Sequence, residues 1–118
     1  MSKESSILLS NISTEAADSS FSYGEKNHGA GYNRVDNGLH TLVYLLDNFK
    51  GTFKVQGTLE LYPAETDWFD IAGTERGGDS SYFSGVTSGT YNFVGNFVWI
   101  RAAYNVQDGT IVEIRYNH

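Results

Sequence analysis

Cysteine is absent from this chain of 118 residues, which excludes disulfides and thiolate metal sites. Burial and backbone hydrogen bonds must therefore hold the core. Long apolar runs are also missing, because the longest, residues 42–46, is far shorter than the roughly 20 residues that a membrane helix requires. We expect no membrane span. The apolar stretch at residues 7–9 is too short for the hydrophobic region of a signal peptide, so we expect no export by that route.

Basic residues are few and scattered. The chain has 8 Lys and Arg against 14 Asp and Glu, which gives a formal net charge of −6. Because phosphate binding depends on clustered cations, nucleic acid is not an expected partner. Proline occurs once, whereas glycine (13) and aromatic residues (seven Phe, eight Tyr and two Trp) are plentiful. This mixture is typical of short strands joined by tight turns.

The length favours a single core, and the composition divides the chain into two parts. Residues 10–37 are rich in Ser, Asn, Gly and Asp and show no sustained period. We therefore interpret residues 1–37 as an irregular N-terminal arm, with at most one short strand near residues 21–23. So long an irregular segment is unusual in a compact monomer, and we expect it to lie against a neighbouring subunit or partner.

Residues 38–118 have the pattern of a β-domain. In residues 52–61, Phe53 and Val55 alternate with Lys54 and Gln56, as in a half-buried strand. The expected strands are residues 40–46, 52–61, 68–71, 82–83, 91–93, 97–104 and 110–116. The expected turns lie at Asp47, Asn48 and Gly51, at residues 73–81, at residues 85–89, and at Asp108 and Gly109. This order predicts an all-β fold, an antiparallel β-sandwich of jelly-roll type with about seven to eight short strands, and a closed barrel is the main alternative.

The last 70 residues also resemble a known family. From about residue 49 the chain runs FKGTFKVQGTLELYPAETDWFDI, a variable Gly/Ser-rich stretch, YNFVGNFVWIRAAY, a DG turn and TIVEIRYN. This order resembles small virion structural proteins of tailed bacteriophages, especially of myoviruses that infect cyanobacteria, which share G-x-L-E-L, D-W-F-x-I and G-N-F-x-W-x-R segments. It is similar, more loosely, to discoidin and galactose-binding-like jelly rolls, a layout that is specific for fold only.

The phage resemblance implies a capsid decoration protein or a tail or baseplate component, located in the virion and made in the host cytoplasm. It implies self-assembly, with a trimer favoured by analogy, and contacts with other virion proteins. The alternative is a carbohydrate-binding module that attaches to host-surface glycans. The sugar-binding pattern is incomplete, because no single loop carries a basic and an aromatic residue that would hold a sugar.

Two sets of candidate residues follow from these hypotheses. The expected interface residues are the arm aromatics and one face of the strand at residues 97–104, namely Phe21, Tyr23, Tyr32, Phe97, Trp99 and Arg101. The expected glycan-stacking residues are aromatics near turns, namely Tyr62, Trp68, Tyr82 and Phe83. Trp68 is favoured for packing between the two sheets, whereas Trp99 fits an interface and a core position equally well.

Metal and catalytic patterns are weak. The carboxylates of Glu65, Asp67 and Asp70 invite a calcium interpretation, but a solvated turn is favoured because the loop lacks the dense Asp/Asn/Gly alternation of a calcium site. The histidines His28, His40 and His118 have no metal-binding spacing. No G-x-S-x-G or phosphate-binding glycine motif occurs. We therefore expect no cofactor and no enzyme activity, although carboxylate pairs across strands, as in a glycosidase, cannot be seen in one sequence.

Overall fold

The computed structural model describes residues 5–13, 21–29, 31, 38–82 and 85–117, and its described part is almost entirely β-structure. Among the elements of the described ranges, one is not a strand, the short 3₁₀ turn η1 (Glu65–Asp67). The strands are β1 (Ser5–Ile12), β2 (Ser22–Tyr23), β3 (Asn27–His28), β4 (Leu39–Thr58), β5 (Phe69–Asp70), β6 (Arg76–Tyr82), β7 (Val86–Val94) and β8 (Trp99–Asn117). All pairings are antiparallel, and the predicted all-β, sandwich-like fold is confirmed.

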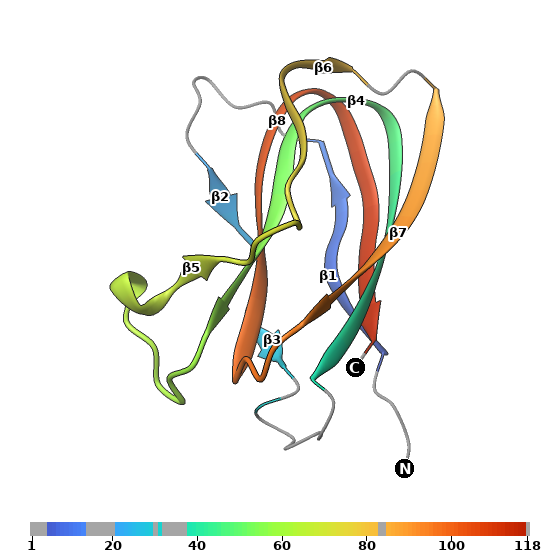
Figure 1. Ribbon diagram of the computed structural model, residues 1–118. Coiled ribbons are helices and arrows are strands. Elements are labelled where there is room, and N and C mark those ends of the chain that lie inside the picture. Colours follow the sequence, from blue (N-terminus) through green and yellow to red (C-terminus); the bar gives the residue numbers. More distant parts are fainter. Residues whose placement is uncertain (1–4, 14–20, 30, 32–37, 83–84, 118) are drawn as a thin grey trace.

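Two long bent strands, β4 and β8, form the centre of the molecule. They pair with each other from Thr41 opposite Asn117 to Thr58 opposite Trp99, and together they arch over one end of the molecule (Figure 1). The register shifts at the arch, between Asp47 and Gly51. Such irregularities increase the local twist and let one strand pass from one layer to the other.

The arch lies where turns were predicted, so the prediction of separate strands on either side of each turn is wrong. Residues 40–46 and 52–58 belong to one strand, which ends at Thr58 and not at residue 61 as expected, and residues 99–104 and 110–116 belong to another. Gly109 shows why the turn residues are needed there. Its φ is +74°, and a Cβ at this position would lie 2.0 Å from the carbonyl oxygen of Asn48. The bend of β8 therefore packs directly on the bend of β4.

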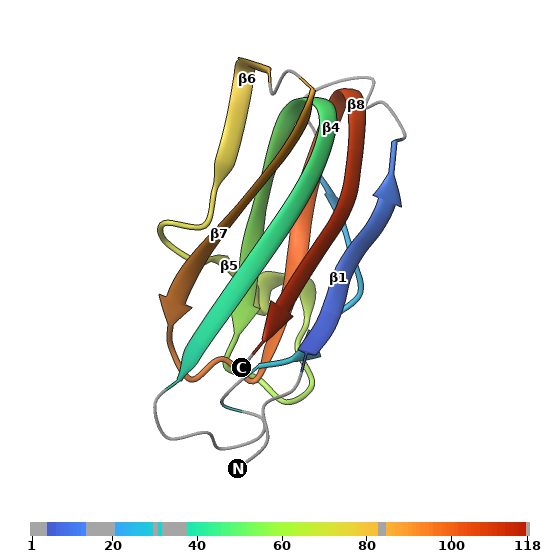
Figure 2. The same cartoon turned by 90° about the vertical axis from the view of Figure 1, so that its right-hand side faces the viewer.

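Each half of the two long strands belongs to a different layer. Layer A contains, in order, β1, the second half of β8, the first half of β4, and β7 (Figure 2). Layer B contains β2 and β3, the first half of β8, the second half of β4, and β5 and β6. The sandwich is thus one continuous sheet folded over on itself.

The core lies between the two layers, and alternate residues of the strands point into it. In layer A, β4 contributes Leu42 and Leu46, which are fully buried. In layer B, Ile100 and Ala102 of β8 point inward. Trp99 and Arg101, which alternate with them along the strand, belong to the opposite face. Burial of each large aliphatic side chain stabilises the fold by about 1.5 to 3 kcal/mol.

The N-terminal segment differs from the expected arm. Its residues 5–12 form β1, which pairs with β8, and Leu8 and Leu9 belong to the core. The expected short strand near residues 21–23 matches β2.

Two of the expected turns are also strands. Residues 76–82 form β6 and residues 86–94 form β7, and both pair with β4. Their Gly- and Ser-rich composition lowers strand propensity, but backbone pairing to the open sides of β4 overrides it. In the described part of the chain, no helix has the length and apolarity that crossing a bilayer demands.

Candidate functional site

The outer face of layer B carries a group of aromatic and charged side chains that contact one another. Its floor is made by β8 and β4, and the segments at residues 21–28 and 59–70 lie beside and over it. Strand alternation places Trp99 and Arg101 on this face, because Ile100 and Ala102 face the core. The face has two parts, an arginine cluster and a tryptophan cavity.

The arginine cluster is centred on the buried side chain of Arg101. Its Nε donates to Oε1 of Gln56 at 2.9 Å, and its Nη1 and Nη2 donate to the two carboxylate oxygens of Glu65 at 3.1 and 3.2 Å. The guanidinium also lies 4.1 Å from the ring centre of Tyr23 and 4.3 Å from that of Trp68. This combines a bidentate ion pair with two cation–π contacts. The Glu65 side chain is 75% exposed, so water weakens the ion pair.

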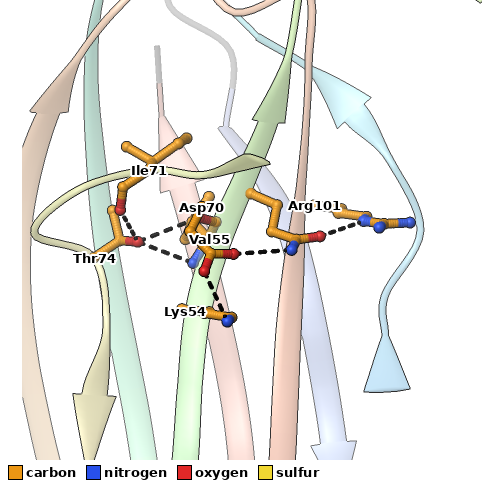
Figure 3. A network of polar contacts seen from close by, with 7 residues as sticks. Lys54, Val55, Asp70, Ile71, Thr74 and Arg101 are labelled. Carbon is orange, nitrogen blue, oxygen red and sulfur yellow. Dashed lines mark hydrogen bonds and ion pairs between the residues drawn. The ribbon is translucent and has the colours of Figure 1, made fainter. Parts of the chain in front are cut away.

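A second carboxylate extends the cluster along β4. Asp70 of β5 accepts hydrogen bonds from Nε2 of Gln56 and from Nζ of Lys54, both at 2.9 Å (Figure 3). The hydrogen bond from Gln56 and the nearby Lys54 lower the pKa of Asp70, and partial burial opposes them. Lys54 in turn lies 4.3 Å from the ring centre of Phe21. Glu65, Arg101, Gln56, Asp70 and Lys54 therefore form one continuous polar chain.

The loop that carries Asp70 is tied to β4 by Thr74. The Thr74 hydroxyl donates to the carbonyl of Ile71 at 2.7 Å, with the carbonyl of Val55 as a second acceptor within reach at 3.3 Å, and it accepts from the Val55 amide at 3.1 Å (Figure 3). Thr74 is fully buried. On the other side of Trp68, the Asp67 carboxylate accepts from the Ala64 amide at 2.8 Å and closes the 3₁₀ turn.

The tryptophan cavity lies next to the cluster, at the start of β8. Trp99 donates its Nε1 proton to the carbonyl of Leu61 at 2.8 Å, which holds the loop that follows β4. Lys26 lies 5.0 Å from the ring centre, and the ring of His28 is 4.8 Å away. Lys26, Leu61, Tyr62, Pro63 and Trp99 line an open cavity of about 480 Å³.

The carboxylates of this face do not converge on a cation. Glu65 binds Arg101, Asp70 binds Lys54 and Gln56, and Asp67 binds a backbone amide. Within the described ranges, no three His, Cys, Asp or Glu side chains are grouped to hold a metal ion. His40 is buried, and its ring stacks on that of Phe93 with 4.7 Å between the ring centres. His118 lies outside the described residues.

Several residues expected at a site meet on this face. Phe21, Tyr23, Trp99 and Arg101 come from the expected interface set, and Tyr62 and Trp68 come from the expected stacking set. The favoured position of Trp68 between the sheets is wrong, because it contacts Arg101 on the outside of layer B.

The other expected residues do not join the face. Phe97 precedes β8 instead of belonging to it, and its ring packs with the core residues His40 and Phe93. Tyr32 and Phe83 lie outside the described residues, as does the side chain of Tyr82. Sequence reasoning missed Lys26, Lys54 and Gln56, since their positions depend on which strands are neighbours.

No protein-family model matches the chain, and no curated protein or solved structure matches it either. Its function is therefore inferred from the fold and from this face of layer B.

Proposed function

We propose that the protein is a non-catalytic structural component of a tailed-phage virion, either a capsid decoration protein or a tail or baseplate protein. It acts through protein–protein contacts. The observation that carries this proposal is the loop patch, which we define as Leu59, Leu61 and Tyr62. All three side chains are exposed, and Tyr62 is 90% exposed.

Exposed large apolar residues that share one loop are typical of contact surfaces. Trp99 holds this loop through the carbonyl of Leu61, so the patch is positioned on the sheet before a partner binds. Tyr62 and Trp99 are the aromatic types that dominate binding energy in protein interfaces. The resemblance of residues 49–118 to virion proteins supports a partner within the particle.

The proposal is tested in the phage that encodes the chain. Purified particles should contain the protein, as measured by quantitative mass spectrometry. Tyr62→Ala should lower its amount in the particles by about tenfold, because it removes an aromatic anchor. Val43→Ala, an exposed apolar change on the outer face of layer A, is the matched control and should leave the amount unchanged. Absence of the unaltered protein from particles overturns the virion proposal, and normal incorporation of Tyr62→Ala overturns the role of the loop patch.

One observation favours a second function, carbohydrate binding. The cavity of about 480 Å³ beside Trp99 has the size of a small-ligand site, and Tyr62 and Lys26 line it together. An aromatic ring and an ammonium group suit a sugar that bears a carboxylate. In this case the isolated protein should bind acidic glycans on an array, and Tyr62→Ala and Lys26→Ala should both reduce the signal. Binding that survives both changes argues against this cavity as a sugar site.

A further inference from the structure

Several strands have an open edge as far as the described residues are concerned, and most of these edges are protected against pairing. β1 has a register shift between Ile7 and Leu9. β2, β3 and β5 have only two residues each. β6 has a register shift against β4 and carries a charge at Arg76. Short length, irregularity and charge are the usual means by which proteins block pairing between edges.

β7 has none of these protections. Its register with β4 is unbroken from Val94 opposite Leu39 to Val86 opposite Asp47. The sequence of β7, VTSGTYNFV, contains no charged residue and no proline. Among the described residues, β7 pairs with β4 alone, and Figure 2 shows it at the outer edge of layer A. It is a long, regular and uncharged edge.

Two hydrogen bonds show which backbone groups of β7 point to the open side. The Gly95 amide donates to the Gly38 carbonyl at 3.0 Å, and the Asn48 amide donates to the Gly85 carbonyl at 2.9 Å. The odd-numbered residues of β7 therefore direct their amides and carbonyls toward β4. Because these directions alternate along a strand, residues 86, 88, 90, 92 and 94 direct their amides and carbonyls toward the open edge.

We propose that β7 pairs antiparallel with β7 of a second copy of this chain, about a two-fold axis at Thr90. This register places Thr90 opposite Thr90, Ser88 opposite Asn92 and Val86 opposite Val94. Polar side chains face polar ones, and the two valines, 73% and 68% exposed in the single chain, cover each other. Roughly ten backbone hydrogen bonds would join the two strands.

The observations favour a second copy over other occupants. The chain has a net charge of −6, so two copies repel over most of their surfaces, but β7 carries no charge. The register is complementary to itself, which a two-fold contact requires. Pairing of β7 with the β1 edge of another copy would instead build an open chain. The dimer replaces the trimer favoured by analogy, and it goes beyond the loop patch, which lies on layer B.

The absence of cysteine makes the register directly testable. Thr90→Cys places two thiols opposite each other, with Cα atoms about 5.5 Å apart, a distance that a disulfide spans. Ser88→Cys is the matched control, because its two copies would lie roughly 13 Å apart along the strands. Under mild oxidation, Thr90→Cys should form at least about tenfold more covalent dimer than Ser88→Cys. A mixture of Ser88→Cys and Asn92→Cys should also cross-link.

Light scattering of the unaltered chain across a dilution series should give the mass of a dimer. Thr90→Pro should shift it to a monomer with an unchanged β circular dichroism spectrum, because the Thr90 amide points away from β4. The proposal is overturned if the chain is a monomer at every concentration and Thr90→Cys does not cross-link. In that case an extended segment of another protein would be the remaining candidate to pair with β7. Equal cross-linking of Thr90→Cys and Ser88→Cys, a trimer, or growth into polymers also overturns the proposal.

Discussion

Arg101 combines four neighbours from three separate parts of the chain. Tyr23 comes from β2, Gln56 from β4, Glu65 from η1 and Trp68 from the residue that follows η1. A planar guanidinium satisfies all four at once, because it donates in the plane and presents its faces to rings. The outer face of layer B therefore depends on the identity of this side chain as well as on its charge.

Arg101→Lys should lower the free energy of unfolding by about 1 to 2 kcal/mol, since an ammonium group cannot replace the bidentate bond to Glu65 and the ring contacts together. Urea denaturation measures this. Arg115→Lys is the matched control, because the Arg115 side chain is half exposed and pairs with Glu113 on the open face of layer A. That change should cost less than about 0.5 kcal/mol. Equal effects of the two substitutions would contradict the special role of Arg101.

Asp70 makes the stability that this cluster contributes depend on pH. Its pKa in the folded chain is held below the usual value of 3.8, chiefly by the hydrogen bond from Gln56. A carboxyl whose folded pKa is lowered contributes stability that is fully present above the unfolded pKa. This contribution is lost as the pH falls from near 4 through the folded pKa. Asp70→Asn should flatten the fall in stability over this acidic range, as measured by thermal unfolding at several pH values, and an unchanged slope would show that Asp70 does not contribute.

At the scale of elements, the arch of β4 and β8 determines the shape of the molecule. The arch needs a residue with positive φ at Gly109, close to the backbone of Asn48. The second bend lies on β4, where the register shifts between Asp47 and Gly51. Without these bends, the two long strands would remain in one layer and expose their apolar faces.

Gly109→Ala should destabilise the fold by about 2 kcal/mol or more, because alanine is strained at this φ and its Cβ would collide with the Asn48 carbonyl. Gly73→Ala is a matched control, since Gly73 also has a positive φ of 81° but nothing lies within 4 Å of the position of its Cβ. It reports the cost of the backbone conformation alone. The difference between the two melting temperatures measures the close approach within the arch, and equal shifts would contradict it.

At the scale of the whole molecule, the N-terminal strand completes the sandwich. β1 covers one side of β8 in layer A, and it places Leu8 and Leu9 in the core. The first described residues therefore take part in folding, in addition to any contact that the rest of the N-terminal segment makes with a partner.

Leu9→Ala should lower the free energy of unfolding by about 2 to 4 kcal/mol, because it leaves a cavity beneath β1. Leu9 is 5% exposed, whereas Ile7 on the same strand is 48% exposed. Ile7→Ala is thus the matched control and should cost less than about 1 kcal/mol. Chemical denaturation of both variants distinguishes a structural β1 from a loosely attached arm, for which neither change would matter.

The sequence by itself determined the class of fold. In the two strands with the clearest alternation, it also determined which side chains face the core. Alternation in residues 52–58 and 99–104 placed Phe53, Val55, Ile100 and Ala102 toward a core, and Trp99 and Arg101 on the opposite face. Side-chain alternation is a local property of a strand, so it can be read without knowing the neighbours.

Only the tertiary structure decided which strands are neighbours. Glu65 and Tyr23 meet Arg101 across 36 and 78 positions of the chain, and no local pattern records such pairings. The strand β6 and the first part of β7 form in stretches that read as turns, because backbone groups of β4 pair with them whatever their side chains, whereas residues 91–93 of β7 were expected as a strand. Among the described strands, the same pairing leaves β7 at an open edge. Register and edge exposure arise from the path of the whole chain, so a local sequence pattern does not record them.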